Sequence, residues 1–367
     1  DRQPEDVMAS AIAAIKAEGY TGIWGADGDH LQTKADIFRV AEAGYTFFTI
    51  DPSDHVNNDA DSMSSAELES AYQDMLDQVQ LTDQNLLEIY LNAAEQVGPD
   101  LLIAFNNRTL LLRAIIKYGA ALKYSKDMYN WIDEANPKRE YEVEISVDET
   151  DTPTSPLEHL FIGLNLKRLG IRIVSLAPRF VGDFEKGIDY IGDLVEFEKQ
   201  YAQHVAIAKY CGPYKLSIHS GSDKFSVYPI MGRLSGEFLH VKTAGTSYLE
   251  ALRVICRTDI PLFREIIGFA RHRFETDKKT YHVSAQLSMV PEKLAAAELE
   301  DVYLDQVPGR QILHVTFGST LKGGQDSRGV FFKELIMNNL LMHKELYKEV
   351  LAIHLGKHLQ LLLADVD

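Results

Sequence analysis

Short apolar runs rich in β-branched residues recur along the chain, and each ends in Gly, Ser, Asp or Pro. This pattern is typical of strands that end in a turn. Eight such runs are predicted to be strands, and they are spread over most of the sequence. They are Thr21–Ala26, Thr46–Asp51, Glu142–Asp148, Ile171–Leu176, Lys215–His219, Phe238–Thr243, Tyr281–Ala285 and Ile312–Phe317.

The stretches between these runs carry apolar residues three and four positions apart, a spacing that places them on one face of a helix. Leu157–Leu169 is a clear case, because Ser155 and Pro156 precede it as a helix start and Gly170 ends it. The other predicted helices are Ala66–Val79, Asn85–Val97, Leu101–Tyr124, Leu194–Tyr210, Tyr248–Cys256, Leu262–Asp277 and the long amphipathic stretch Arg328–Leu363.

Strands that alternate with helices form parallel sheets, because each helix returns the chain to the edge where the next strand begins. Eight such units predict an α/β fold, a single TIM-type (β/α)8 barrel over residues 1–367 that includes the C-terminal helical segment 328–363. A doubly wound open sheet is the alternative. No Gly-x-Gly-x-x-Gly follows the first predicted strand, so nucleotide binding has no support.

Polar residues occupy one face of several predicted strands, where side chains alternate between the two sides of the sheet. Glu144 and Asp148 alternate with valine and isoleucine in one strand. His219 ends another strand, and His240 and Lys242 share one face of the next. An interior this polar indicates a site rather than only a packed core.

Catalytic residues of such barrels lie at the carboxyl ends of the strands. Imidazoles and carboxylates from different strands are the ligands of a divalent ion such as Zn, Mn, Co or Ni. For each histidine alone, a hydrogen-bonded core residue is the alternative, and for Gly25–His30 an acidic turn. The candidates are Asp27, Asp29, His30, Asp51, Asp54, Glu144, Asp148, Glu149, His219, Asp223, Lys224, His240, Lys242, His282 and His314.

The formal net charge of -17 argues against nucleic acid or an anionic membrane as a partner. Cys211 and Cys256 form neither a disulfide framework nor a zinc-finger spacing, which favours a cytoplasmic location. No apolar run approaches the ~20 residues needed to span a bilayer. The chain begins with Asp1 rather than Met, so we expect residues upstream of it. The sequence leaves open whether the chain forms a homo-oligomer.

Several long segments resemble one family, the tagaturonate epimerases, which are barrel enzymes of bacterial hexuronate metabolism. The resemblance extends from residue 21 to about residue 320, although family members carry a further N-terminal region that this sequence lacks. The segments are GADGDH (25–30), YTFFTIDPSDHV (45–56), EISVDETDTPTSPLEH (144–159), EKGIDYIGDL (185–194), YKLSIHSGSDKFSVYP (214–229), LHVKTAGTSYLEAL (239–252), YHVSA (281–285) and LHVTFGS (313–319).

The resemblance implies an epimerase that depends on one divalent metal ion and interconverts D-tagaturonate and D-fructuronate at C4. Asp29 then corresponds to the proton acceptor and Glu144 to the opposing acid. His30, His219 and, by extension, His240 correspond to metal ligands. Some relatives also act on the ketohexoses tagatose and fructose, so the substrate is a small sugar with or without a carboxylate.

The remaining candidates are assigned to substrate binding, with the cations as partners for a substrate carboxylate. They are Asp148, Arg179, Lys224, Lys242, His282 and His314. Because the C4 proton of a 2-ketose is not α to the carbonyl, we expect retro-aldol cleavage and re-closure of the C3–C4 bond.

Three other functions compete with this interpretation. A metal-dependent aldolase or ketose isomerase would use the same barrel and ligands. An amidohydrolase usually carries His-x-His after its first strand, whereas this chain has Asp-x-Asp-His at 27–30. A non-catalytic sugar-binding protein would not need the inward acids Asp29 and Glu144 or the inward histidines.

Overall fold

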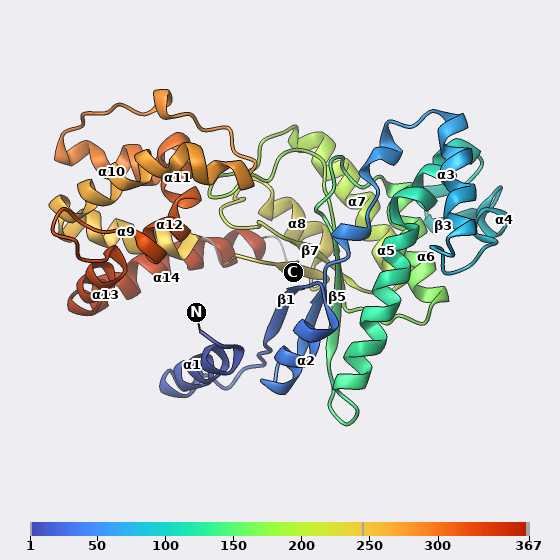
Figure 1. The fold of residues 1–367 in the computed structure, drawn as a ribbon, viewed down its shortest axis with the longest axis horizontal. Helices are drawn as coiled ribbons and strands as arrows, with labels where there is room; N and C mark the ends of the chain where they lie inside the picture. Colours follow the sequence, from blue (N-terminus) through green and yellow to red (C-terminus); the bar gives the residue numbers. More distant parts are fainter. Residues whose placement is uncertain (1, 244–245, 365–367) are drawn as a thin grey trace. The chain divides into compact units, whose positions relative to one another are not determined.

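The structure of the chain is a computed structural model that describes residues 2–243 and 246–364. The chain divides into two compact units, whose elements are coloured in chain order in Figure 1. The first unit consists of residues 1–181, 196–217 and 237–240, and the second of residues 182–195, 218–236 and 241–367. The single domain expected over residues 1–367 stays a prediction.

A six-stranded sheet has the order β1-β2-β5-β6-β7-β8, and the paired strands from β1 to β7 are parallel. The mixed α/β class with a parallel sheet is therefore confirmed, whereas a closed eight-stranded barrel is not. The strands are β1 (Asp27–Leu31), β2 (Phe47–Ile50), β5 (Glu142–Val147), β6 (Ser175–Pro178), β7 (Lys215–Ile218) and β8 (Leu239–Val241).

Helices cover this sheet in the first unit, where α5 packs against α2, α3 and α6. β5 is buried from Val143 to Val147, as expected of a parallel strand covered on both faces. The unit also contains a small antiparallel hairpin. Its remaining elements are α1 (Pro4–Ala17), α2 (Lys34–Glu42), α3 (Ser65–Asp77), α4 (Leu86–Tyr90), β3 (Ala94–Gly98), β4 (Leu101–Ala104), α5 (Arg108–Ala135), α6 (Pro156–Arg168) and most of α7 (Leu194–Cys211).

The start of α6 follows the local sequence signals closely. The Ser155 backbone N–H donates to the Glu158 carboxylate at 2.7 Å, and the Glu158 N–H donates to Ser155 Oγ at 3.3 Å. This reciprocal cap satisfies amides that have no partner within the helix, and Pro156 begins the first turn without needing one. The predicted helix start is confirmed.

The second unit is mainly helical and has its own apolar core. α9 packs against α10, α13 and α14, and α14 also packs against α8. Leu252, Phe263 and Leu313 are among the fully buried residues of this core. The helices are α8 (Tyr228–Ser235), α9 (Ser247–Thr258), α10 (Ile260–Asp277), α11 (Val307–Val315), α12 (Phe317–Gly323), α13 (Phe332–Met342) and α14 (Lys344–Leu362).

The last two predicted strands are wrong. Ile312–Phe317 lies mostly in α11, whose first turn contains Pro308, a helix start that the strand prediction overlooked. Tyr281–Ala285 is irregular. In that segment the Ala285 N–H donates to the Gln311 side chain at 3.0 Å, so a side chain rather than a neighbouring strand satisfies the backbone.

Four other predicted boundaries are also wrong. The predicted first strand Thr21–Ala26 contains no strand residue, because β1 is Asp27–Leu31, so GADGDH runs into the strand instead of following it. Asn85–Val97 splits into α4 and β3, and Leu101–Tyr124 begins with β4 before α5 starts. The stretch Arg328–Leu363 is two helices, α13 and α14, with a break at His343. In the three predicted helices, a turn or break interrupts a stretch of helix-like spacing.

Within the described residues, none of the helices has an apolar stretch long enough to span a bilayer.

Candidate functional site

Glu144 is the centre of a hydrogen-bonded group in the first unit. It lies on β5 with its side chain fully buried, and the parallel register pairs it with Thr49 of β2 and Ser175 of β6. Ser175 Oγ donates a hydrogen bond to Glu144 Oε2. His240 Nδ1, from β8, lies 2.7 Å from the same oxygen. The carboxylate therefore has polar partners from two other strands.

His240 is held in one orientation by this contact. A carboxylate can only accept hydrogen bonds, so the proton of a neutral His240 ring is on Nδ1 and the lone pair is on Nε2. Ser217 Oγ lies 3.3 Å from Nδ1, and the ring of Phe47 packs edge-on with centroids 5.4 Å apart. The His240 side chain remains 30% exposed, so its Nε2 edge is available to a ligand.

His30 on β1 has the same kind of partner. Its Nδ1 lies 3.3 Å from Asp51 Oδ2, directly after β2, and its Nε2 lies 3.9 Å from Asp29 Oδ1. The hydrogen bond with Asp51 raises the pKa of His30 to about 9, against the opposing effect of burial. The carboxylates of Asp29 and Asp148 add to this rise. The imidazole is thus surrounded by negative charge.

Several hydrogen-bond donors keep Asp51 ionised beside His30. Burial alone would raise the pKa of Asp51, but hydrogen bonds from His30, Ser53 and Gln32 outweigh it and lower the pKa to about 2. Gln32 Nε2 donates at 2.9 Å to the oxygen that faces His30. Asp51 is therefore an ionised acceptor that orients the imidazole.

His30 and His240 together could hold a divalent metal ion. Each has Nδ1 paired with a carboxylate, which is the arrangement commonly found behind metal-bound histidines. An ion bound at His30 would take the place of a proton, because the ring is otherwise charged at neutral pH. The residues of the first unit therefore fit a metal ligand role.

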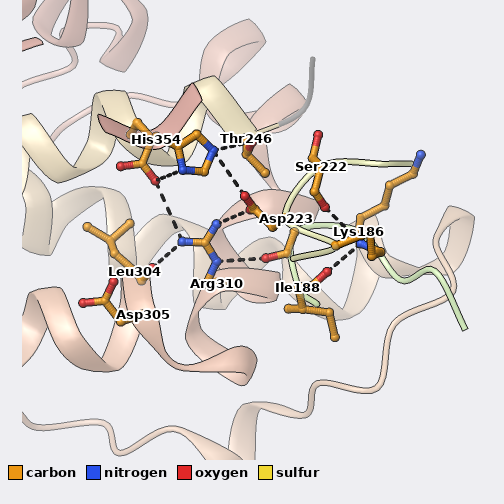
Figure 2. A network of polar contacts seen from close by, with 12 residues as sticks. Lys186, Ile188, Ser222, Asp223, Thr246, Leu304, Asp305, Arg310 and His354 are labelled. Carbon is orange, nitrogen blue, oxygen red and sulfur yellow. Dashed lines mark hydrogen bonds and ion pairs between the residues drawn. The ribbon is translucent and has the colours of Figure 1, made fainter. Parts of the chain in front are cut away.

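A second polar network lies entirely within the second unit. Figure 2 shows Arg310 beside Asp223, at 2.6 Å between Nη2 and Oδ2. Lys224 Nζ donates to the backbone carbonyls of Glu185, Ile188 and Ser222 at 2.8, 2.5 and 3.0 Å. Burial lowers the pKa of Lys224 to about 8. These contacts bind the segment after β7 to the segment that contains residues 185–188.

The comparisons with known proteins agree with each other. A family model described as tagaturonate epimerase matches residues 1–362. A tagaturonate/fructuronate epimerase of Thermotoga maritima is 41% identical over 359 residues, which cover 97% of this chain and 71% of that protein. The native crystal structure of the fructuronate-tagaturonate epimerase of Cohnella laeviribosi has a TM-score of 0.90 at 38% identity, with 97% of this chain and 72% of that chain covered. A glycerol complex of the same enzyme gives the same values.

The chain belongs to the tagaturonate epimerase family. This confirms the resemblance inferred from the motifs, and it places the chain in a family of carbohydrate epimerases.

Among the residues assigned to this epimerase from its motifs, Asp29, His30, Glu144 and His240 all lie in the first unit. Their proposed roles stay predictions. His219 directly follows β7, is buried and belongs to the second unit.

The predicted substrate-binding residues lie in diverse surroundings. Lys224 is fully buried and bonded to carbonyls, and His282 is 81% exposed with Asp183 at 3.9 Å. His314 is buried on α11, where burial lowers its pKa to about 4. Lys242 is half-buried after β8, and its backbone N–H donates to the Ile218 carbonyl at 3.0 Å.

Arg179 and Asp148 are the remaining two predicted substrate-binding residues, and both lie in the first unit. Arg179 follows β6, is half-buried, and donates from its guanidinium to the Thr150 carbonyl. Asp148 follows β5 and accepts a hydrogen bond from Ser146. Both already take part in polar contacts at the ends of their strands.

Sequence reasoning missed three features of the site in this family member. Asp51 was among the candidates at the strand ends, but its pairing with His30 was not predicted. Ser175 carried no motif. Asp27, which had no assigned role, accepts hydrogen bonds from Thr49 Oγ1 at 3.0 and 3.2 Å. Only the register between strands could have identified these pairs.

Proposed function

We propose that this chain catalyses the C4 epimerisation that interconverts D-tagaturonate and D-fructuronate, with one divalent metal ion as cofactor. Family membership and the names of its relatives support the reaction. The observation that carries the proposal is the pair of carboxylate-bound imidazoles, Asp51 with His30 and Glu144 with His240. A packed core has no need of two such pairs.

His30 and His240 would hold the metal through Nε2, with His219 as the third predicted ligand. When bound, the ion supplies a Lewis acid for the substrate carbonyl at C2. Asp51 and Glu144 fix the ring orientations and keep the proton of each imidazole on Nδ1. The two side chains are therefore already ordered before the ion binds, so ordering them does not reduce the affinity for the ion.

Asp29 would act as the base that takes the proton from the C4 hydroxyl. The C3–C4 bonding pair then moves onto C3, where the adjacent C2 carbonyl delocalises it, and C4 becomes an aldehyde. Rotation of that aldehyde and re-formation of the bond invert C4. The new C4 alkoxide then needs a proton on the opposite side of the sugar, and Glu144 would supply it.

The proposed base Asp29 and the proposed acid Glu144 differ in their exposure to solvent. Asp29 is about half exposed, with a side-chain exposure of 52%, whereas Glu144 is fully buried among polar partners. An exposed carboxylate is suited to meet an incoming hydroxyl. A buried one exchanges its proton through its hydrogen-bond partners, here Ser175 and His240.

The test is an assay with D-tagaturonate, with and without a chelator, in which NMR identifies every product. We expect D-fructuronate, and we expect the chelator to abolish its formation. Asp29→Asn and Glu144→Gln should each lower the rate by about 10²–10⁴-fold, the usual contribution of an acid or base. Asp29→Asn should leave the metal content unchanged, whereas Glu144→Gln should also weaken metal binding by about 10–100-fold, because Glu144 orients His240. Asp77→Asn, an exposed carboxylate on α3, is the matched control and should not change the rate.

The outcomes separate the competing functions. Smaller fragments that do not recombine would make the chain an aldolase, and an aldose product would make it an isomerase. Activity that survives complete removal of metal would refute the cofactor. A panel of hexuronates and ketohexoses in the same assay would show whether the substrate carboxylate is required.

A further inference from the structure

We propose that Asp223, His354 and His358 form a second divalent-metal site, within the second unit, that takes a zinc-like ion. His354 and His358 are one helical turn apart on α14, so both imidazoles project from the same face. Asp223 comes from the segment after β7. One ligand atom from each of the three residues lies within 4.8 Å of the other two.

The distances between these atoms match those of a tetrahedral site. Zinc binds nitrogen and oxygen at about 2.0–2.1 Å, so the ligand atoms around it are about 3.3 Å apart. Asp223 Oδ1 lies 3.2 Å from His354 Nε2 and 3.6 Å from His358 Nε2. The two distances from Asp223 Oδ1 thus match the spacing that a bound ion requires, and the two nitrogen atoms lie within 4.8 Å of each other.

The neighbours of the two imidazole rings indicate which ring nitrogen carries the proton. His358 Nδ1 donates to the His354 carbonyl at 2.8 Å, and His358 Nε2 accepts the Asp223 backbone N–H at 3.2 Å. His354 Nδ1 lies 3.6 Å from Glu250 Oε1, which can only accept. His354 Nε2 also lies 2.9 Å from Thr246 Oγ1, whose hydroxyl can donate to it. With the proton of each ring on Nδ1, both Nε2 atoms accept hydrogen bonds, and a bound ion would replace the Thr246 hydroxyl and the Asp223 N–H as their partners.

Asp223 Oδ1 is the independent observation that points to a cation. Asp223 is 4% exposed, and within the described residues its Oδ1 is buried without a hydrogen-bond partner. A buried carboxylate oxygen without a hydrogen-bond donor is costly, and two imidazole nitrogens, His354 Nε2 and His358 Nε2, lie 3.2 and 3.6 Å from it. A divalent ion among the three atoms would satisfy all of them at once.

The surroundings provide the outer contacts that metal sites need. Arg310 binds the other oxygen of Asp223 at 2.6 Å, and Figure 2 shows Oδ1 directed toward His354. Glu250 lies behind His354, on the side away from Asp223. Carboxylates and carbonyls in these positions orient ligating histidines and increase their basicity.

The ion would fasten α14 to the segment after β7. α14 already packs against α8 and α9, and a metal clamp at His354 and His358 would hold its C-terminal half. With three protein ligands, the ion keeps a fourth position for water. We assign it a role in holding α14, which is independent of the epimerisation proposed above.

The test uses the His30→Gln/His240→Gln double variant, in which the predicted catalytic ligands are removed. We expect this variant to bind one zinc ion per chain by elemental analysis, and zinc to raise its melting temperature by about 5 °C at 100-fold excess over Kd. Adding His354→Gln and His358→Gln should abolish both effects. His272→Gln, an exposed histidine on α10, is the control that should change neither.

If the double variant binds no zinc, the second site is refuted and the proposed function is unaffected. If the wild-type chain with only His354→Gln and His358→Gln loses all its metal and its activity, the ligands of the proposed function are wrong instead. Should the quadruple variant fail to fold, Co²⁺ titration of the double variant decides: the ligand-field spectrum of a four-coordinate ion supports the site. The absence of that spectrum overturns it.

Discussion

Replacement of Lys224 by methionine tests whether this lysine binds substrate or holds the second unit together. The sequence assigned Lys224 to a substrate carboxylate. In the structure its ammonium group is fully buried and donates to three backbone carbonyls. Methionine fills a similar volume but can donate to none of them, so the substitution removes the hydrogen bonds and leaves the carbonyls without a donor.

The magnitude follows from two opposing contributions. Hydrogen bonds to a charged group contribute about 1.5–3 kcal/mol each, so three contribute about 5–9 kcal/mol. Burial lowers the pKa of Lys224 from 10.5 to about 8. That difference means that the charged form is disfavoured by about 3 kcal/mol, which the substitution recovers. We therefore expect Lys224→Met to lower the free energy of unfolding by about 2–6 kcal/mol at neutral pH.

The same pKa predicts how stability depends on pH. Between about pH 8 and 10.5 the unfolded chain holds a proton on Lys224 that the folded chain has released. The free energy of unfolding of the wild type therefore increases over this interval, by up to about 3 kcal/mol from this group. Lys224→Met lacks this increase, so the difference between the two proteins should grow with pH.

Urea unfolding at several pH values, together with steady-state kinetics on hexuronate and ketohexose, measures both effects. Lys322→Met, an exposed lysine on α12, is the matched control. A Lys224→Met variant with wild-type stability and an increased KM for hexuronates alone would refute our reasoning. It would restore the role in carboxylate binding.

Three further predictions concern single positions. Asp51→Asn should lower the pKa of His30 from about 9 toward 6.5 in an NMR titration and weaken metal binding by about 10–100-fold; an unchanged pKa would contradict the pairing. Phe263→Ala should cost about 3–5 kcal/mol in urea unfolding, because the ring is fully buried in the second core, and a loss below 1 kcal/mol would show that the core collapses around it. Gly232→Ala should increase hydrogen exchange in α14, because a Cβ at this position would collide with the Leu362 carbonyl; unchanged exchange would argue against this close packing.

The sequence alone was sufficient where a signal is local. The alternation in Glu142–Asp148 predicted β5 to within one residue, and Ser155 with Pro156 predicted the start of α6. These signals succeed because the alternation of side chains along a strand and the capping of a helix depend on neighbours in the chain. The family also followed from the sequence, because long motifs preserve the identity of residues wherever they lie in the fold.

Tertiary structure alone decided the elements whose partners are distant in the chain. Ile312–Phe317 is a short, mostly apolar run, so periodicity could not separate a buried helix from a buried strand. Ala285 gave no sign that the side chain of Gln311 would satisfy its backbone. The two polar clusters also join residues that are far apart in the sequence. Glu144 contacts His240, and Asp223 contacts His354, across about a hundred residues or more. Such contacts arise only when packing brings strands and helices together, and no local pattern encodes them.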